Sequence, residues 1–156
     1  MKEADLNADL VIRSATQTDV ARLIELLEGG ALVAGREDLG DFESYRSALA
    51  EIVAGPGTVL VAERNGVVVA MCQLVIFRHF QARGSRCAEV ESVHVHPDVR
   101  GQGIGHALME AVIEQARQLG CARLQLTSNV ARPRAHSFYE SLGFSPSHIG
   151  FKLALK

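Results

Sequence analysis

The chain has 156 residues, of which 47% are hydrophobic, and its formal net charge is −2. This length predicts one domain with a core large enough to fold without disulfides or a structural metal. The small charge, with lysine and arginine scattered along the chain, argues against a nucleic-acid-binding protein.

The start of the chain and the cysteines bear on its location. Residues 1–9 are acidic and lack the apolar core of a secretory signal, and no apolar run approaches the ~20 residues that cross a bilayer. Cys72, Cys87 and Cys121 are well separated in apolar stretches, and buried free thiols fit a reducing compartment. We therefore expect a flexible segment over 1–9, one domain over 10–156, a cytoplasmic location and no membrane partner.

Hydrophobic periodicity and turn signals predict alternating strands and helices. Thr18 and Asp19 can cap the first helix, Gly29-Gly30 can end it, and Asn65-Gly66 is a strong hairpin signal. In chain order the predicted elements are a strand at 10–13, a helix between 18 and 30, a helix at 42–53, antiparallel strands at 58–63 and 67–77, a polar loop at 78–86, a strand at 87–95, a helix at 103–119, a strand at 123–127, a helix at 133–142 and a last strand around 148–155. The helix at 103–119 carries an apolar stripe that predicts core positions: Ile104, Leu108, Val112, Ala116 and Leu119.

The junction between the strand at 87–95 and the following helix carries an arginine and three glycines in five positions. It reads Arg100-Gly101-Gln102-Gly103-Ile104-Gly105. Glycines permit backbone angles that let main-chain N–H groups surround an anion, and the start of a helix attracts phosphate through its unpaired N–H groups and its dipole. Arg100 adds a donor fork that suits phosphate oxygens. This junction therefore predicts a diphosphate site, although such turns also occur for steric reasons alone.

Two better-known phosphate loops do not fit this junction. A P-loop requires Lys and then Ser or Thr after its last glycine, whereas Gly105 is followed by His106-Ala107. A dinucleotide-binding unit requires Gly-x-Gly-x-x-Gly and an acid at the end of the next strand, and residues 123–127 contain no carboxylate. What remains is Arg-x-x-Gly-x-Gly.

Two ordered motifs resemble the GNAT superfamily of N-acetyltransferases, whose members transfer an acetyl group from acetyl-CoA to an amine. The first covers 89–105, and the second covers 128–144 and ends in Phe-Tyr-x-x-x-Gly-Phe. One predicted helix and one predicted strand separate them, as in the family, and the similarity extends loosely from residue 10 to 155. The resemblance implies an α+β (mixed α/β) fold: a single GNAT-like domain with a central, mostly antiparallel mixed sheet, splayed central strands and about four flanking helices.

The resemblance also implies where acetyl-CoA binds. Main-chain groups of Val93 and Val95 would face the pantetheine arm and the thioester, because the family's strands part at this point. Asn129 matches a position that hydrogen-bonds the arm, and Arg132 and Arg134 could approach the phosphates or simply be solvated charges. The complete set of expected cofactor-binding residues is Val93, His94, Val95, Arg100, Gly101, Gln102, Gly103, Ile104, Gly105, His106, Asn129, Arg132, Ser137 and Phe138.

Acetyl transfer requires a base, because an alkylammonium group with a pKa near 10.4 must lose a proton before it attacks. Glu89 and Glu91 are two residues apart on one strand and so face the same side. The resemblance favours Glu91, acting directly or through water, with Glu89 as the second choice. Both could instead be solvated strand residues or ion-pair partners.

The departing CoA thiolate requires a proton, and Tyr139 is the expected acid. Its phenol has an ordinary pKa near 10, against about 8.5 for a thiol, and it occupies the tyrosine position of the second motif. Alternatively, the Tyr139 ring only packs against its neighbours and has no catalytic role. His94 and His96 at strand spacing raise the possibility of a metal, but isolated histidines usually pack or hydrogen-bond, so no metal is expected.

The acceptor is the least determined part of the hypothesis. Residues 126–148 are similar to bacterial aminoalkylphosphonate N-acetyltransferases, and cofactor segments say little about acceptors. We expect a small amine that carries a phosphonate or carboxylate, with walls from 32–45 and 77–86 and with His79, Arg83 and Arg86 available for the acidic group. A non-catalytic acetyl-CoA sensor and a protein N-acetyltransferase stay open as alternatives. So does a homodimer formed through the last strand.

Overall fold

The computed structural model describes residues 9–155, so the start of the expected flexible segment at 1–8 lies outside the described residues. Five strands form one open sheet in the order β1-β2-β3-β4-β5. The first four strands pair antiparallel, and β4 and β5 pair parallel. The strands are β1 (Leu10–Ser14), β2 (Thr58–Arg64), β3 (Val67–Arg78), β4 (Arg86–Val95) and β5 (Arg123–Leu126).

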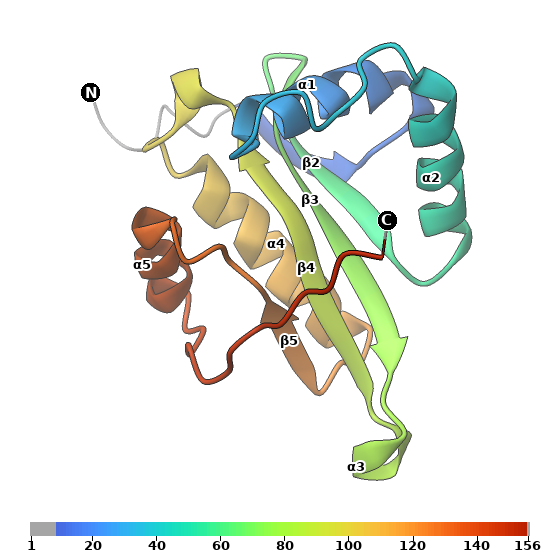
Figure 1. Ribbon diagram of the computed structural model, residues 1–156, viewed down its shortest axis with the longest axis vertical. Coiled ribbons are helices and arrows are strands. Elements are labelled where there is room, and N and C mark those ends of the chain that lie inside the picture. The colour runs from blue at the N-terminus through green and yellow to red at the C-terminus, as the bar shows by residue number, and fades with distance from the viewer. Residues whose placement is uncertain (1–8, 156) are drawn as a thin grey trace.

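Helices cover both faces of the sheet (Figure 1). Helices α1 (Val20–Gly30) and α2 (Phe42–Ala54) pack on one face, where Ile24 and Leu49 meet Val61 and Met71. Helix α4 (Ile104–Gln118) packs on the other face, and α5 (Pro133–Ser141) lies beside it against the same core cluster. The fold is therefore the expected α+β arrangement with a mostly antiparallel mixed sheet.

The local signals placed most elements correctly. Asn65 and Gly66 both have positive φ (52° and 76°), as the tight β2–β3 turn requires. On α4, Ile104, Leu108, Val112 and Ala116 are buried as predicted, together with Met109, while Leu119 is half-buried. The first helix is preceded by a 3₁₀ turn at Gln17–Asp19, whose capping box uses Thr16 and Asp19, not Thr18.

Two expectations about irregular segments are wrong. The loop predicted at 78–86 contains a short helical turn, α3 (Gln81–Gly84), in which Ala82, Arg83 and Gly84 have positive φ. The strand predicted around 148–155 is not formed, since the structure assigns no strand to these residues. Its apolar side chains alternate along the chain, as in a strand, but they are 82–91% exposed and pair with no neighbour in the described sheet.

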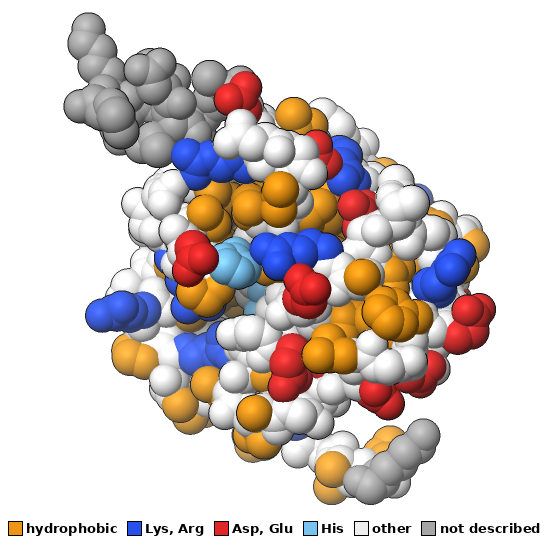
Figure 2. Space-filling view, turned by 90° about the horizontal axis from the view of Figure 1, so that it is seen from above, with side chains coloured by type: hydrophobic (Ala, Val, Ile, Leu, Met, Phe, Trp, Pro, Cys, Tyr) orange, Lys and Arg blue, Asp and Glu red, His pale blue; other side chains and the backbone are white. Residues whose placement is uncertain are grey.

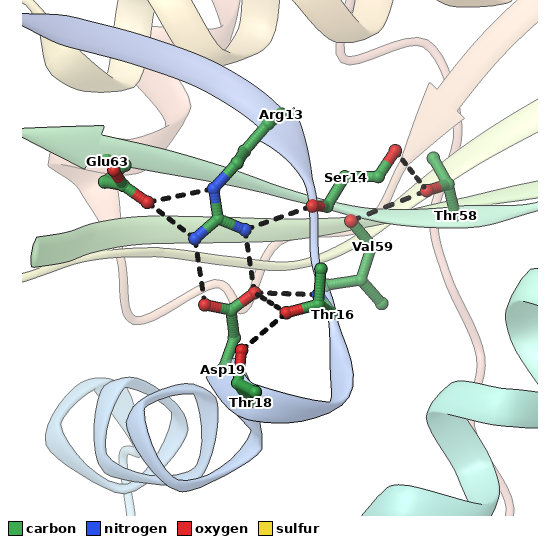
Figure 3. Close-up of polar contacts among 8 residues, drawn as sticks. All are labelled: Arg13, Ser14, Thr16, Thr18, Asp19, Thr58, Val59 and Glu63. Atoms are coloured by element: carbon green, nitrogen blue, oxygen red, sulfur yellow. Dashed lines mark hydrogen bonds and ion pairs between the residues drawn. The ribbon is translucent and has the colours of Figure 1, made fainter. Parts of the chain in front are cut away.

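A partly buried arginine network joins the start of α1 to the edge of the sheet (Figure 3). The Arg13 guanidinium donates to both carboxylate oxygens of Asp19, at 2.8 and 2.9 Å, and to Glu63 Oε2, at 2.6 and 2.9 Å. Asp19 Oδ2 also accepts the Thr16 N–H at 2.7 Å. These donors lower the pKa of Asp19, which is 7% exposed, to about 2, the Arg13 hydrogen bonds being the largest cause.

Replacing this carboxylate should destabilise the fold in a pH-dependent way. A pKa of about 2 in place of 3.8 corresponds to about 2 kcal/mol. Because the folded-state pKa is depressed, this stability is present above pH ~4 and is lost as the pH falls toward ~2. Denaturant titrations of Asp19→Asn should therefore show a deficit of about 2 kcal/mol at pH 7 that shrinks below pH 4. Glu25→Gln, which breaks an exposed pair with Arg22, is the control and should cost under ~0.5 kcal/mol. Equal unfolding energies for Asp19→Asn and wild type at pH 7 would contradict the prediction.

Candidate active site

The loop between β4 and α4 presents unpaired main-chain N–H groups. Gly101 and Gly103 have φ of 74° and 79°, and a Cβ at either position would meet nothing within 4 Å, so the backbone angle alone requires glycine. The first hydrogen bond of the helix runs from the Ala107 N–H to the Gly103 carbonyl at 3.0 Å. The N–H groups of Ile104, Gly105 and His106 therefore have no acceptor within the helix. The first turn of α4, which the structure describes completely, contains no acidic side chain. The site is suited to an anion.

Side chains fix the path of this loop. Arg100 Nε donates to the Val95 carbonyl at 3.0 Å, so one edge of the expected phosphate-binding fork is used to hold the loop against β4. Gln102 accepts from Arg64 Nη1 at 2.6 Å and donates to the Asp98 carbonyl at 3.3 Å. The Arg100 side chain is exposed, and the other edge of its guanidinium extends beyond this contact.

Gly105 allows α5 to approach the loop. A Cβ at this position would lie 3.5 Å from Phe138 Cζ and 3.5 Å from Val95 Cγ2. The Phe138 ring also meets His106 edge-on, with ring centroids 5.6 Å apart. The two expected cofactor motifs are therefore in contact through these residues. Ile104, by contrast, is buried in the core, so it can offer only its main chain.

Strands β4 and β5 part about halfway along β4. Their parallel pairing ends at Val90 and Leu126, and β4 continues to Val95 without β5 beside it. The His96 N–H donates to the Val69 carbonyl of β3, and successive residues of a strand alternate in direction. The main-chain groups of Val95 and Val93 therefore point to the open side, where β5 has left.

A bulge in β4 accompanies this parting. Ser92 has a positive φ of 53°, and the register slips between the pairs Gln73–Glu91 and Met71–His94. Because of the extra residue, Val93 and Val95 join the core on the α4 side. Glu91 and His94 are placed on the opposite face.

The two glutamates of β4 share that face, as expected, but their surroundings differ. Glu89 Oε2 accepts from Gln125 Nε2 of β5 at 2.8 Å. Burial raises the pKa of Glu91, and a hydrogen bond and repulsion from Glu89 raise it further, while Lys152 acts in the opposite direction. Glu91 is thus the carboxylate whose proton affinity is shifted toward neutral pH, which suits a base.

Tyr139 approaches the same gap from α5. Its ring is half-buried between Phe138 and Phe144, with centroids 5.3 and 6.1 Å away. Burial raises the pKa of its hydroxyl most strongly, with Arg132 lowering it and Cys72 and Glu91 raising it. The phenol therefore stays protonated at neutral pH and lies within electrostatic reach of Glu91.

The end of α1 packs directly on His94. A Cβ at Gly30 would lie 1.9 Å from His94 Nδ1 and 2.5 Å from Cε1, so only glycine leaves room for the ring. Arg132 Nη2 donates to the Gly30 carbonyl at 2.6 Å. Burial lowers the pKa of His94, with Arg132 and Arg100 acting in the same direction and Glu37 against it. Viewed from above, this end of the molecule shows histidine between arginine and acidic side chains (Figure 2).

The segment that leads into α5 is ordered by its own side chains. Asn129 Oδ1 accepts from the Ala131 N–H at 2.9 Å, and the Asn129 carbonyl contacts His136 Nε2 at 2.9 Å. Ser137 Oγ donates to the Pro133 carbonyl at 3.3 Å. Asn129 and Ser137 are exposed, and Arg132 is half-buried through its contact with α1.

The structure does not bring together the cations expected for an acidic acceptor group. Residues 77–86 form the far end of the β3–β4 hairpin, away from the glycine-rich loop (Figure 1). Arg86 caps α4 by donating to the Leu119 carbonyl at 2.8 Å, and His79 contacts Arg123 at 3.0 Å. Arg86 and His79 are therefore used in structural contacts.

Histidine positions also differ from the expectation. The strand ends at Val95, so His96 shares no strand face with His94; it accepts from the Asp98 N–H instead. Among residues 9–155, no three His, Cys, Asp or Glu side chains gather as metal ligands do. No helix in the described part of the chain is long and apolar enough to cross a membrane.

Sequence reasoning missed three residues of this region. Gly30 was interpreted only as a helix stop, Gln125 only as a strand residue, and Lys152 as part of a final strand. A glycine pair at one helix end was the available signal for Gly30, since a single C-terminal glycine suffices to end a helix. Nothing in the sequence pattern distinguishes Lys152.

The chain matches the model of the Acetyltransferase (GNAT) family over residues 23–144. An aminoalkylphosphonate N-acetyltransferase from Salmonella typhimurium is 34% identical over 116 residues, covering 74% of this chain and 75% of that protein. A glucosamine 6-phosphate N-acetyltransferase from Trypanosoma brucei brucei is 32% identical over 148 residues, covering 94% and 97%. The solved structure of a protein described as a transcriptional regulator from Bacillus halodurans C-125 superposes with a TM-score of 0.88 at 36% identity, covering 94% and 99%.

The Gly30 contact can be tested with its neighbour as control. Gly30→Ala should displace the His94 ring and lower the unfolding free energy by about 1–3 kcal/mol, because a Cβ overlaps the ring. Gly29→Ala meets nothing within 4 Å and should be neutral or stabilising by up to ~1 kcal/mol. The double variant Gly30→Ala/His94→Ala should recover part of the loss. If Gly30→Ala and Gly29→Ala have equal stability, the overlap is not significant.

Proposed function

The chain belongs to the Acetyltransferase (GNAT) family and is an acyltransferase, and from this premise we propose that it transfers an acetyl group from acetyl-CoA to the primary amine of a small molecule. The observation that carries the proposal is the gap between β4 and β5 beyond Val90, flanked by an anion-binding helix start, Glu91 and Tyr139. The family supplies acetyl-CoA as the expected donor.

The diphosphate of the cofactor is assigned to the start of α4. The N–H groups of the first turn supply donors, the positive helix end supplies charge, and the free edge of Arg100 supplies a further cation. The residues proposed to bind the cofactor remain the expected set, with the main-chain groups of Val93 and Val95 facing the thioester arm. Isothermal titration with acetyl-CoA tests this assignment, and no detectable affinity would refute it.

Acetyl-CoA supplies an activated acetyl group as a thioester. Glu91 removes a proton from the acceptor ammonium, directly or through water, so that the nitrogen lone pair can attack the carbonyl carbon. The Val93 and Val95 amides, which point into the gap, stabilise the negative charge that develops on the carbonyl oxygen. As the carbon–sulfur bond breaks, Tyr139 donates its proton to the departing thiolate. The acetylated nitrogen then loses its remaining extra proton to the tyrosinate, directly or through water, which leaves a neutral amide and restores the phenol.

The acceptor is proposed to be a small amine that carries a phosphonate or carboxylate. Two relatives are named for amines that carry an anionic phosphorus group, the phosphonate of an aminoalkylphosphonate and the phosphate of glucosamine 6-phosphate. The segment 31–41 borders His94 through Glu37, whose Oε2 accepts a hydrogen bond from the Tyr45 hydroxyl at 2.8 Å. This segment supplies a wall for the acceptor.

The free thiols of the described chain, Cys72, Cys87 and Cys121, support the proposed cytoplasmic location.

A homodimer is proposed through the C-terminal segment. Ile149, Phe151, Leu153 and Leu155 are 82–91% exposed, and a second copy could cover this apolar row. Sedimentation velocity should give a dimer for the wild type and a monomer for Phe151→Lys, and a wild-type monomer would contradict it.

A non-catalytic acetyl-CoA sensor is the second candidate, because one similar structure is described as a transcriptional regulator. Thiol release from acetyl-CoA with a panel of small amines and a peptide amine discriminates the candidates. Tight acetyl-CoA binding with no amine-dependent release would favour the sensor, and release with the peptide alone would favour a protein N-acetyltransferase.

The role of Glu91 predicts a specific pH profile. In the wild type, kcat/KM should rise with pH as Glu91 loses its proton, at a pKa above the ordinary glutamate value, because its pKa is raised. Glu91→Gln should lose this acidic limb and about a hundredfold in kcat/KM at pH 7, and should approach the wild type near pH 10, where the acceptor is already neutral. Glu89→Gln is the matched control, and a larger loss there would move the base to Glu89. The affinity of both variants for acetyl-CoA should equal that of the wild type, which would show that the substitutions do not affect cofactor binding.

Tyr139 should act at the leaving group. Tyr139→Phe keeps the ring and its packing but removes the proton donor, so kcat should fall about tenfold to a hundredfold with KM for acetyl-CoA little changed. A thioester with a more acidic thiol should be affected less, because its thiolate leaves without help. Steady-state rates with both thioesters check this, and wild-type kcat in Tyr139→Phe would rule out an essential acid.

A further inference from the structure

The main chain of the loop before α4 has little restraint of its own. The 3₁₀ turn that opens the loop ends with the Arg100 N–H donating to the Pro97 carbonyl at 3.3 Å, and the next main-chain donor is the Ala107 N–H. Between these two bonds, no main-chain N–H of the loop has a main-chain acceptor in the described part of the chain. Gly101 and Gly103, which have the widest choice of backbone angles, lie in this stretch. The N–H groups proposed to bind the diphosphate therefore depend on side chains for their arrangement.

Gln102, which stands between the two glycines, supplies this restraint. Its Nε2 donates to the Asp98 carbonyl at 3.3 Å and so ties it to the preceding 3₁₀ turn. Its Oε1 accepts from Arg64 Nη1 at 2.6 Å and so ties it to the end of β2. Both side chains are half-buried. Because a hydrogen bond from a charged guanidinium is stronger than one between neutral groups, the contact with Arg64 is the main tie.

The sheet fixes the position of Arg64 independently of the loop. Arg64 is the last residue of β2, and it pairs with Val67 across the β2–β3 turn and with Leu10 of β1. The loop begins at the same end of the sheet, because the His96 N–H donates to the Val69 carbonyl of β3 at 2.8 Å (Figure 1). An ordered strand end thus presents a guanidinium to a loop that is rich in glycine.

We propose that Arg64 is a positioning residue for acetyl-CoA, which acts through Gln102 to hold the loop before α4 in the conformation that binds the diphosphate. This inference rests on the proposed function, since it takes the diphosphate of acetyl-CoA as the ligand of the loop. A loop that is already ordered loses less conformational entropy when its ligand binds. Loss of the Arg64–Gln102 bond therefore weakens cofactor binding, and it leaves the groups that act on the amine in place.

Cofactor affinity is the first test. Arg64→Met keeps an unbranched stem but removes the donor, so the Kd for acetyl-CoA from isothermal titration should rise about fivefold to tenfold. KM for acetyl-CoA should rise in parallel, while KM for the amine should change by less than about twofold. Arg64→Lys, which keeps a charged donor on a different side chain, should recover part of the affinity. Arg46→Met makes the same substitution at an exposed position of α2 and should keep the wild-type Kd.

A double variant separates positioning from a direct attraction between Arg64 and the diphosphate. Gln102→Leu removes the acceptor of the bond and should raise the Kd by a similar factor. Arg64→Met/Gln102→Leu should then bind no more weakly than Gln102→Leu alone, because the two residues act through one hydrogen bond. A direct attraction would instead give losses that add and that shrink at high ionic strength. Losses that add would overturn the proposal.

Hydrogen exchange of the free protein tests the same bond without a ligand. The N–H groups of Arg100 and Ala107, which are hydrogen-bonded at the two ends of the loop, should exchange faster in Arg64→Met and in Gln102→Leu than in the wild type. Gln102→Leu leaves the sheet unaltered, so it carries this test even if Arg64→Met does not fold. A wild-type protein that binds no acetyl-CoA would refute the proposed function, and the exchange rates would still report on the loop. A wild-type Kd in Arg64→Met, or wild-type exchange in both variants, would overturn the role of Arg64 alone.

Discussion

The free edge of β4 beyond Val90 is the constraint on which the site depends, because main-chain groups that lose a strand partner inside a protein must find another one. The parallel pair ends at Leu126, and β5 is only four residues long. One of the freed carbonyls, that of Val95, takes Arg100 Nε as its donor. Other freed groups on this edge can serve an extended ligand arm, which hydrogen-bonds as a strand does.

The bulge at Ser92 decides which side chains of β4 face this free edge. One residue in a left-handed conformation costs of order 1 kcal/mol, and the rest of β4 compensates through its long pairing with β3. Without the extra residue, strict alternation would continue the face of Glu89 and Glu91 through Val93 and Val95. With it, those two valines join the core and the acids keep the open face.

Burial raises the pKa of both Glu91 and Tyr139. The raised pKa has a different consequence for an acid that is ionised at neutral pH than for one that is protonated. A glutamate with a raised pKa is a stronger base when it is ionised, whereas a tyrosine with a raised pKa is a secure proton reservoir at neutral pH. The two groups approach the gap from different elements, β4 and α5, so that in the proposed reaction a proton is removed on one side of the thioester and supplied on the other.

The sequence predicted those parts of the fold that depend on residues close together in the chain. It failed for those that depend on contacts between residues far apart in the chain. Asn65-Gly66 and the α4 stripe depend only on nearby residues, and the glycines at 101 and 103 predicted the backbone of the loop before α4. Residues 148–155 carry the alternation of a strand, but a strand also requires an unpaired edge beside it, which no local pattern reveals. Arg86 and Arg132 were available in the sequence for anion binding, and the structure uses them on the carbonyls of Leu119 and Gly30.

The use of Arg132 has a consequence for the charge of the whole site. The end of α1 directs its carbonyls, and the negative end of its dipole, toward the region of β4 that borders the anion site at α4. An unopposed negative end there would weaken the binding of a diphosphate. Arg132 is hydrogen-bonded to the last carbonyl of α1, that of Gly30, and so supplies the opposing charge. In the proposed complex this charge would favour phosphate, and loss of Arg132 would affect cofactor binding and the His94–Gly30 packing together.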